Sequence, residues 1–212
     1  GFAVIINNYE FYNEMLIMGP SGPSMIRMNQ KRLRREGSVA DSEKLQNFLV
    51  EEGFIVKSFS NLTANEMLGV FFNVSRTDHT GLDSFFCFLA SHGRREGSLL
   101  GSDCREIKIA DLTTMVDSSN CLSLSRKPKC FFIQGCKGEH GNIKGKGLLS
   151  FRSNIERHID DSTRHIPNTC DFLLCYSMSQ GCTKYHTSQR GSLLFQFLIK
   201  CIQKFKQRQV SN

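Results

Sequence analysis

The fold is decided by the stretch Phe85–Gly93, which reads FFCFLASHG. It opens with an apolar run, which predicts a short buried strand, and a histidine and a glycine follow just after it. A second stretch with a similar pattern, Cys130–Cys136 (CFFIQGC), begins with an apolar run and ends in a cysteine. Because open α/β sheets form their binding crevices at the carboxyl ends of strands, we expect the His92 imidazole and the Cys136 thiol to lie along one edge of a sheet.

Strand-like and helix-like segments alternate along the rest of the chain. Strands are predicted at Phe2–Ile6, Phe54–Phe59, Phe85–Ala90, Cys130–Ile133 and Asp171–Tyr176. Helices are predicted at Ser38–Glu51 with Ser38 as N-cap, at Thr63–Asn73 with Thr63 and Glu66 as a capping box, at Ala110–Val116 and at Ser192–Phe205. The alternation predicts an α/β fold, with a mostly parallel sheet flanked by helices on both faces. Residues 12–32, which contain the turn-forming run GPSGP, are predicted to form a loop.

Composition limits the class of protein. The chain has 212 residues, of which 40% are hydrophobic and 22% charged, as in a single soluble globular domain over residues 1–212. No apolar run is long enough to span a membrane, so no membrane association is predicted. The formal net charge is +7, with basic clusters at Lys31–Arg35 and Lys204–Arg208. Neither cluster forms a recognisable nucleic-acid-reading motif, so we interpret them as solvated basic faces and predict no nucleic-acid partner.

The cysteines indicate a reduced compartment. The chain has nine, an odd number with irregular spacing and no CxxC pair. A zinc site is therefore not expected, and we predict no metal and no other cofactor. Reduced thiols favour the cytosol or nucleus, and we predict a cytoplasmic protein. The chain does not begin with methionine, so the polypeptide is expected to start upstream.

The two sheet-edge stretches suggest nucleophilic chemistry. Cys136 precedes a lysine and a glycine, and a neighbouring cation at a turn lowers the pKa of a thiol and exposes it. A buried structural cysteine is the alternative, just as His92 alone would often be structural. Together a thiol and an imidazole are the groups that acyl transfer to cysteine requires. The N–H groups of Gly93 and Cys136 are candidates for an oxyanion hole.

The motifs taken together resemble the catalytic domain of the caspases over nearly the whole chain. The matching segments are GFAVIINN at residues 1–8, REGSVAD at 35–41, DHT at 78–80, DSF at 83–85, SHG at 91–93 and KPKCFFIQGC at 127–136. The family signature is Q-A-C-[RQG]-G, with its histidine roughly 50 residues upstream. Here Gly135 replaces the alanine, and Lys137 stands where the family usually has arginine.

The resemblance implies a three-layer caspase-like fold with two subunit-like parts. Residues 1–137 correspond to the large subunit, 138–169 to the inter-subunit linker and 170–212 to a shortened small subunit. In the family a final antiparallel strand pairs across the two-fold axis of the dimer. This chain stops at Asn212, so that strand is expected to be missing and Asp171–Tyr176 to form an exposed edge. A homodimer of the family type would then lack its pairing strand.

The resemblance also implies residue roles. Cys136 would attack the scissile carbonyl, His92 would act as acid and base, and the carbonyl of Leu33 would orient the imidazole. Arg35 and Gln134 match two of the three residues with which the family binds the aspartate before the cleaved bond (P1).

The remaining pocket residues depart from the family. Tyr185 stands in place of a tryptophan and His186 in place of the second arginine. Arginine is always charged whereas histidine is not, so weaker aspartate binding is expected.

Three functions are weighed. The first is a cysteine endopeptidase that cleaves protein substrates after aspartate in apoptosis or inflammatory signalling, made as a zymogen and cut at Asp160 or Asp161; these two aspartates are equally well read as surface carboxylates. The second is a weakly active caspase-like regulator that binds other caspases or adaptor proteins. The third, a relative that cuts after basic residues, would need acidic pocket groups, and Arg35 argues against it.

Overall fold

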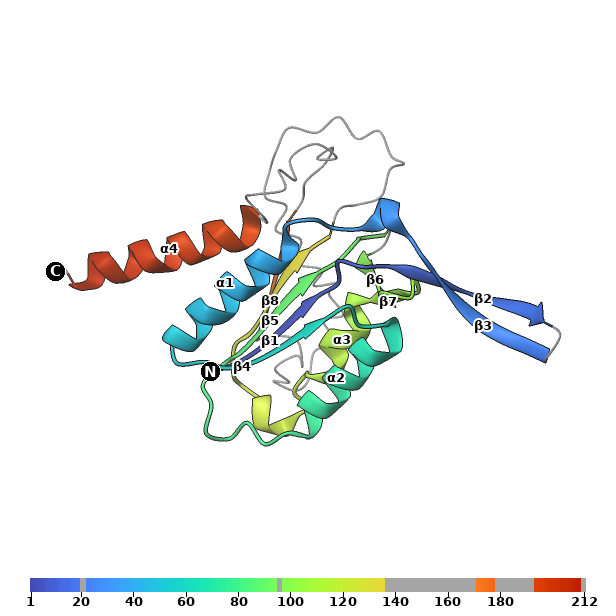
Figure 1. Cartoon of the computed structure of the whole chain (residues 1–212). Coiled ribbons are helices and arrows are strands. Elements are labelled where there is room, and N and C mark those ends of the chain that lie inside the picture. Colours follow the sequence, from blue (N-terminus) through green and yellow to red (C-terminus); the bar gives the residue numbers. More distant parts are fainter. Residues whose placement is uncertain (20–21, 95–96, 136–170, 178–192, 211–212) are drawn as a thin grey trace, which may run out of the picture.

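The structure is a computed structural model that describes residues 1–19, 22–94, 97–135, 171–177 and 193–210. Its centre is a five-stranded sheet in the order β4-β1-β5-β8-β9, in which every pairing is parallel (Figure 1). The strands are β1 (Phe2–Asn7), β4 (Ile55–Ser60), β5 (Phe85–Ala90), β8 (Lys129–Gln134) and β9 (Phe172–Ser177). The predicted strands therefore form the sheet. Within the described ranges no antiparallel strand joins it, and β9 is an edge strand.

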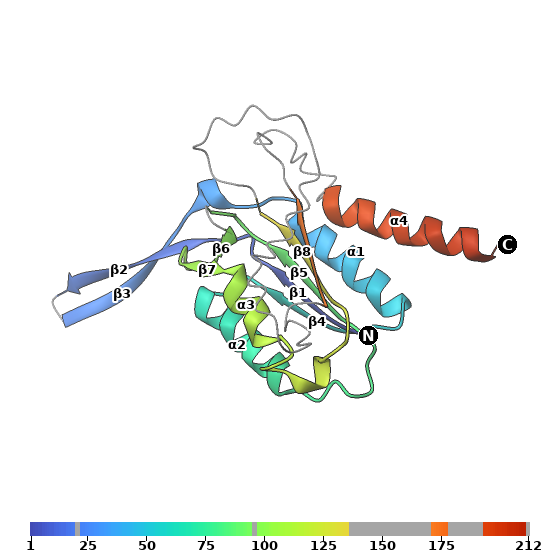
Figure 2. The same cartoon turned by 180° about the vertical axis from the view of Figure 1, so that it is seen from behind.

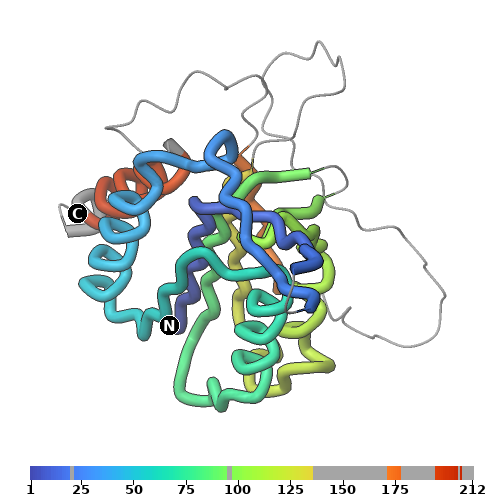
Figure 3. The backbone as a smooth tube through the Cα atoms, turned by 45° about the vertical axis from the view of Figure 1, so that its right-hand side comes forward, coloured from blue at the N-terminus to red at the C-terminus, as the bar shows by residue number. Residues whose placement is uncertain are grey.

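Helices cover both faces of the sheet, which gives three layers. Helices α1 (Ser38–Glu51) and α4 (Leu193–Val210) lie on one face, and α2 (Ala64–Arg76) and α3 (Ile109–Met115) on the other (Figures 1, 2 and 3). The predicted α/β class is confirmed. Because helix-covered parallel strands are buried on both sides, β1 and β5 read as continuous apolar runs rather than as alternating ones.

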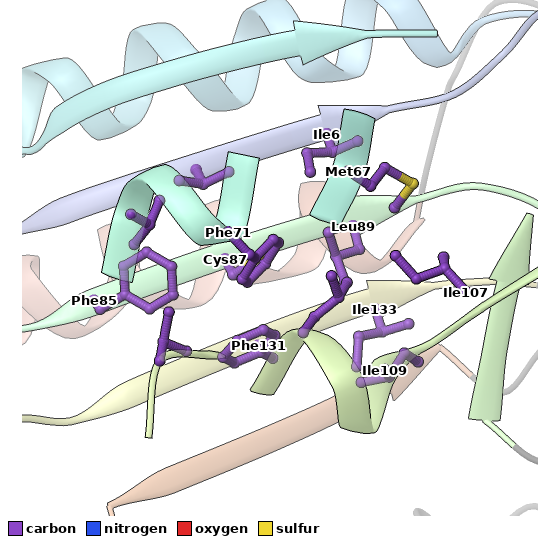
Figure 4. Close-up of a cluster of buried hydrophobic side chains, with 14 of the residues drawn as sticks. Ile6, Met67, Phe71, Phe85, Cys87, Leu89, Ile107, Ile109, Phe131 and Ile133 are labelled. Carbon is purple, nitrogen blue, oxygen red and sulfur yellow. The ribbon is translucent and has the colours of Figure 1, made fainter. Parts of the chain in front are cut away.

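Each face has its own apolar core. The core under α2 and α3 is built around aromatic rings of the sheet and α2, with Phe71 stacked on Phe131 and edge-on to Phe85 (Figure 4). On the other face, Phe195 of α4 meets Phe88 of β5 at 82°, with ring centroids 5.8 Å apart. Helix α4 is thus packed into the same core as strands β1 and β5 and helix α1.

A buried lysine also connects the two segments. Lys129 begins β8, and its Nζ donates to the carbonyl oxygens of Leu124 (2.8 Å) and Lys127 (2.9 Å). Burial lowers the pKa of this ammonium group, and the carboxylate of Asp171, 3.7 Å away, opposes that shift. The ion pair therefore joins β8 to the start of β9.

The predicted loop over residues 12–32 is wrong. Strands β2 (Tyr12–Gly19) and β3 (Gly22–Asn29) form an antiparallel hairpin that projects away from the sheet, followed by the 3-10 turn η1 (Lys31–Leu33) (Figures 1 and 2). Gly19 and Gly22 of the GPSGP run form the last pair of the hairpin, at its tip. Two three-residue strands, β6 (Ser98–Leu100) and β7 (Glu106–Lys108), were also not predicted, because they are too short to show a period.

The helix starts follow local capping rules. Ser38 is not the N-cap of α1: Gly37 occupies that position with φ of 77°, a left-handed conformation that favours glycine, and the Ser38 hydroxyl donates to the Arg35 carbonyl at 3.0 Å. The predicted capping box of α2 is confirmed. Thr63 Oγ1 accepts from Glu66 N–H, and a Glu66 carboxylate oxygen accepts from Thr63 N–H at 2.7 Å.

Candidate active site

The backbone around His92 is fixed by its strand neighbours. Ser91 N–H donates to the carbonyl of Gln134, the last residue of β8, at 3.0 Å, which extends the β5–β8 ladder one residue past the end of β5. Leu100 N–H donates to the carbonyl of His92 at 2.9 Å. His92 therefore lies at the carboxyl edge of the sheet, as predicted, beside the strand that leads to Cys136.

The imidazole of His92 is held on two sides by the base of the hairpin. Its Nε2 lies 2.7 Å from the Leu33 carbonyl oxygen. Because a carbonyl oxygen only accepts hydrogen bonds, Nε2 carries a proton and donates it. The contact expected from the resemblance is thus present. The ring of Phe11, which is 3% exposed, packs on the imidazole with centroids 4.9 Å apart. Phe11 was not predicted, since a single aromatic residue before a presumed loop carries no signal.

Gly135, which precedes Cys136, is closely packed. A Cβ atom at this position would lie 2.8 Å from Leu99 Cδ2 and 3.2 Å from Gly93 Cα. Gly93 in turn forms an isolated antiparallel bridge with Leu99. The backbone at Gly135, just before the candidate nucleophile Cys136, therefore lies directly against Gly93, and there is no room for a side chain between them.

Arg35 is buried at the carboxyl end of β1. Its Nη1 donates to Asn7 Oδ1 (3.2 Å) and to the Asn8 carbonyl (2.9 Å), and its own N–H donates to the Tyr9 carbonyl. Asn8 is itself fully buried and bonded to neighbouring backbone, including Leu62 N–H at 2.8 Å. Asn7, which ends β1, and Asn8, which follows it, thus position the guanidinium group, a role that the sequence alone did not reveal.

The structure brings some predicted site residues together and leaves others undescribed. His92, Gly93, Arg35 and Gln134 lie along the same carboxyl edge, where Gln134 is half-buried and opposite Ala90. Five predicted residues lie outside the described ranges: Cys136, Asp160, Asp161, Tyr185 and His186.

Four of the described cysteines are poor nucleophiles. Burial raises the pKa of the thiols of Cys87, Cys104, Cys130 and Cys175, which disfavours the reactive thiolate. In the part of the chain that the structure describes, no group of three histidine, cysteine or acidic side chains could hold a metal ion. No described helix is long and apolar enough to cross a membrane.

A parallel sheet between two helical layers, with a histidine and an arginine at its carboxyl edge beside the strand that leads to a cysteine, has the architecture of a caspase-type domain. Comparison with known proteins agrees: the caspase domain model matches residues 1–212, and the chain belongs to the caspase family, a family of cysteine proteases. It is similar to Caspase-8 of Mus musculus, with 31% identity over 205 residues, 95% of this chain and 41% of the relative.

Two further relatives have similar identity. Caspase-6 of Gallus gallus is 32% identical over 176 residues, covering 80% of this chain and 57% of the relative. Caspase-3 of Xenopus laevis is 29% identical over 204 residues, covering 95% of this chain and 64% of the relative. The chain thus spans less than two thirds of the length of these relatives.

Proposed function

We propose that this protein is a cysteine endopeptidase that cleaves protein substrates after aspartate, with Cys136 as nucleophile and His92 as acid and base. The main support for this proposal is the 2.7 Å contact between His92 Nε2 and the Leu33 carbonyl, at the sheet edge beside β8. This contact fixes one imidazole nitrogen as a permanent donor. Proton exchange with the reacting groups then falls to Nδ1, so a backbone carbonyl takes the orienting role that a carboxylate has in other triads.

The reaction proceeds in two stages. The Cys136 thiolate attacks the scissile carbonyl carbon, and the oxyanion that forms accepts hydrogen bonds from the N–H groups of Gly93 and Cys136. The C–N bond breaks as imidazolium Nδ1 of His92 gives its proton to the leaving amine. Nδ1 then takes a proton from water, which attacks the thioester and releases the acid product and Cys136.

Aspartate recognition is assigned to Arg35 and Gln134, with Tyr185 and His186 completing the pocket. A buried guanidinium group binds a carboxylate strongly, and the contacts of Arg35 to Asn7 and Asn8 supply the necessary rigidity. Since His186 stands at an arginine position, His186→Arg is expected to raise kcat/KM for an aspartyl peptide. No gain in this variant would count against the assignment.

The remaining parts of the proposal concern organisation and setting. Residues 1–137 and 170–212 act as large- and small-subunit-like parts of one domain, joined by a linker at 138–169 that is cut at Asp160 or Asp161 to activate a zymogen. The partners are protein substrates, other caspases or adaptors, and a second copy in a homodimer. The setting is apoptotic or inflammatory signalling in the cytoplasm. Changing both linker aspartates to alanine should abolish processing.

An activity-based probe with an aspartyl recognition group tests the function directly. The wild-type chain should become labelled, whereas Cys136→Ala and His92→Ala should not, and circular dichroism confirms that the variants are folded. The alternative, a weakly active regulator of other caspases, is favoured by one observation, the replacement of the pocket tryptophan and arginine by Tyr185 and His186. Absence of labelling at any protein concentration and pH would favour this alternative.

A further inference from the structure

The β2–β3 hairpin exposes an unusual amount of apolar surface. Its large exposed side chains, with their exposed fractions, are Met15 (45%), Leu16 (60%), Met18 (79%), Met25 (59%) and Met28 (48%). Leu16 faces Met25 directly across the two strands, and Met18 lies next along β2 on the same side. We call Leu16, Met18 and Met25 the hairpin surface. Contiguous exposed apolar side chains of this kind mark interaction sites, and methionine suits a surface that adapts to its partner.

Both edges of the hairpin are open, except at the start of β2, where Tyr12 N–H donates to the Ser102 carbonyl at 2.8 Å. Among the described residues β2 and β3 pair only with each other, so each strand presents one row of backbone donors and acceptors that no further strand meets. A two-stranded hairpin is marginally stable by itself in water, and an added strand supplies main-chain hydrogen bonds and covers side chains. The outer edge of β3 is therefore a template for an extended segment.

Positive charge adjoins the base of β3. The strand ends at Asn29, and Lys31, Arg32 and Arg34 follow it, all exposed. The only acidic side chain that the structure places against them is Glu10, whose carboxylate lies 3.8 Å from Arg34, in a pair that is 60% and 57% exposed. Within the hairpin itself Glu14 and Arg27 balance each other, 3.5 Å apart. The hairpin is thus neutral and apolar towards its tip, whereas the turn at its base is basic.

We propose that the outer edge of β3 and the hairpin surface bind an extended segment of another protein, with alternating apolar residues and acidic residues at one end. The segment adds as a third, antiparallel strand, because antiparallel pairing is slightly more stable per residue. Since β3 runs from the tip to the base, an antiparallel partner runs from the base to the tip. Its acidic residues must then lie at its N-terminal end, opposite Lys31 and Arg32.

A partner with acidic residues fits this surface better than a second copy does. Every copy of the chain carries a net charge of +7, so like charge disfavours a second copy at this surface, whereas an acidic segment is attracted. The hairpin surface contains none of the pocket residues of the proposed protease, although Lys31 and Arg32 share a turn with Leu33, whose carbonyl contacts His92. Binding to the hairpin surface can therefore be measured without peptide cleavage.

The probe is a fluorescent eight-residue peptide with two aspartates at its N-terminus, followed by alternating valine and threonine. Fluorescence anisotropy measures its binding to the full chain carrying Cys136→Ala, which prevents cleavage. A peptide of reversed sequence is the control for direction. We expect saturable binding of the forward peptide, weaker binding of the reversed one, and an affinity that falls as salt is raised.

Two pairs of variants locate the site. Leu16→Ser with Met25→Ser should weaken binding at least about ten-fold, whereas Met15→Ser with Met28→Ser, on the opposite side of the hairpin, should have a smaller effect.

Lys31→Glu with Arg32→Glu should weaken binding about ten-fold, and the same charge change in α4, Lys200→Glu with Lys204→Glu, should not. Circular dichroism establishes that each variant is folded.

Three results would overturn the proposal. They are the absence of saturable binding, equal binding of the reversed peptide, and equal loss of binding in the α4 control. Sedimentation velocity adds a fourth: a dimer of the wild-type chain that Leu16→Ser with Met25→Ser dissociates would assign the hairpin surface to self-association instead.

Discussion

Replacing Gly135 by alanine tests the close packing beside the candidate nucleophile. The added Cβ would lie 2.8 Å from Leu99 Cδ2 and 3.2 and 3.3 Å from the Cα and N atoms of Gly93. Leu99 is 1% exposed, so its side chain cannot turn away freely, and Gly93 can yield only by moving its backbone. Overpacking of this kind typically costs about 1–3 kcal/mol. The lower entropy of the unfolded alanine chain offsets about 0.4–1 kcal/mol, which leaves a net loss of about 1 kcal/mol.

The assay is urea unfolding of four proteins in a double-mutant cycle. Leu99→Val removes the clashing Cδ2 atom and by itself costs about 1 kcal/mol, as for other buried aliphatic truncations. In the Leu99→Val background, Gly135→Ala should lower the free energy of unfolding by less, and the coupling energy between the two substitutions should be about 1 kcal/mol. Gly69→Ala in α2 is the matched control, since a Cβ there would meet nothing within 4 Å. It should stabilise the chain by about 0.5–1 kcal/mol.

Two outcomes would refute this reasoning. One is a Gly135→Ala variant that is more stable than the wild type. The other is additivity of the two substitutions to within about 0.5 kcal/mol, which would mean that Leu99 and residue 135 do not compete for space. The caspase signature has alanine at the position of Gly135. The result of the test shows whether this chain has adapted its packing around glycine.

Three further predictions concern stability and assembly. Thr63→Ala removes the hydroxyl but keeps the backbone N–H, so it should cost about 1 kcal/mol and flatten the acid dependence of urea unfolding only in part. The Thr63 N–H and hydroxyl hold the pKa of Glu66 below its ordinary 4.5, so the wild-type chain has this contribution in full above pH 4.5 and loses it as pH falls through the lowered folded value. Equal pH dependence in both proteins would contradict this account. Lys129→Met should cost about 1–3 kcal/mol, because two carbonyl oxygens lose their donor, and an unchanged urea midpoint would disprove the role of this lysine. One cut of the chain between residues 136 and 170 should leave the two pieces associated, so they should elute together on gel filtration without denaturant. The β8–β9 ladder, the Lys129–Asp171 pair and the burial of Phe195 hold them together. Separate elution of the two pieces would contradict this prediction.

The central sheet was predictable because its signals are local and strong. Helix-covered parallel strands must be apolar throughout, and runs such as FFCFLA have few other readings. Segment boundaries also came close, since α1 spans the predicted Ser38–Glu51. The N-cap of α1 was misassigned because Ser38 has the right chemistry, whereas the left-handed backbone of Gly37 is visible only in the structure.

The hairpin could not be predicted for a definite reason. Strands are recognised by alternation of apolar and polar residues, and here both sides of β2 carry apolar side chains, as in Met15 next to Leu16. Pro23 added to the impression of a loop, although proline is tolerated in a strand at an open edge. The sequence therefore lacked the period that would have indicated a strand.

At the candidate site the resemblance supplied what local patterns did not. His92 and Gln134 follow from strand ends, but the contact between His92 and the Leu33 carbonyl joins segments far apart in sequence, and only the family motif suggested it. The roles of Phe11 and of the buried asparagines Asn7 and Asn8 followed neither from local patterns nor from the resemblance. Their roles depend on which strand lies beside which, and the order β4-β1-β5-β8-β9 is a tertiary property.

Phe11 and Leu33, the two residues that hold the imidazole, flank the segment that contains the hairpin. Gln30 N–H donates to the Phe11 carbonyl at 2.7 Å, so this segment is closed at its base, where the hairpin leaves the sheet. The entropy of closing a loop grows slowly with its length, so everything beyond this closure can lengthen, shorten or change sequence at little thermodynamic cost. Changes in the hairpin beyond this closure should therefore leave the orientation of His92 unaltered.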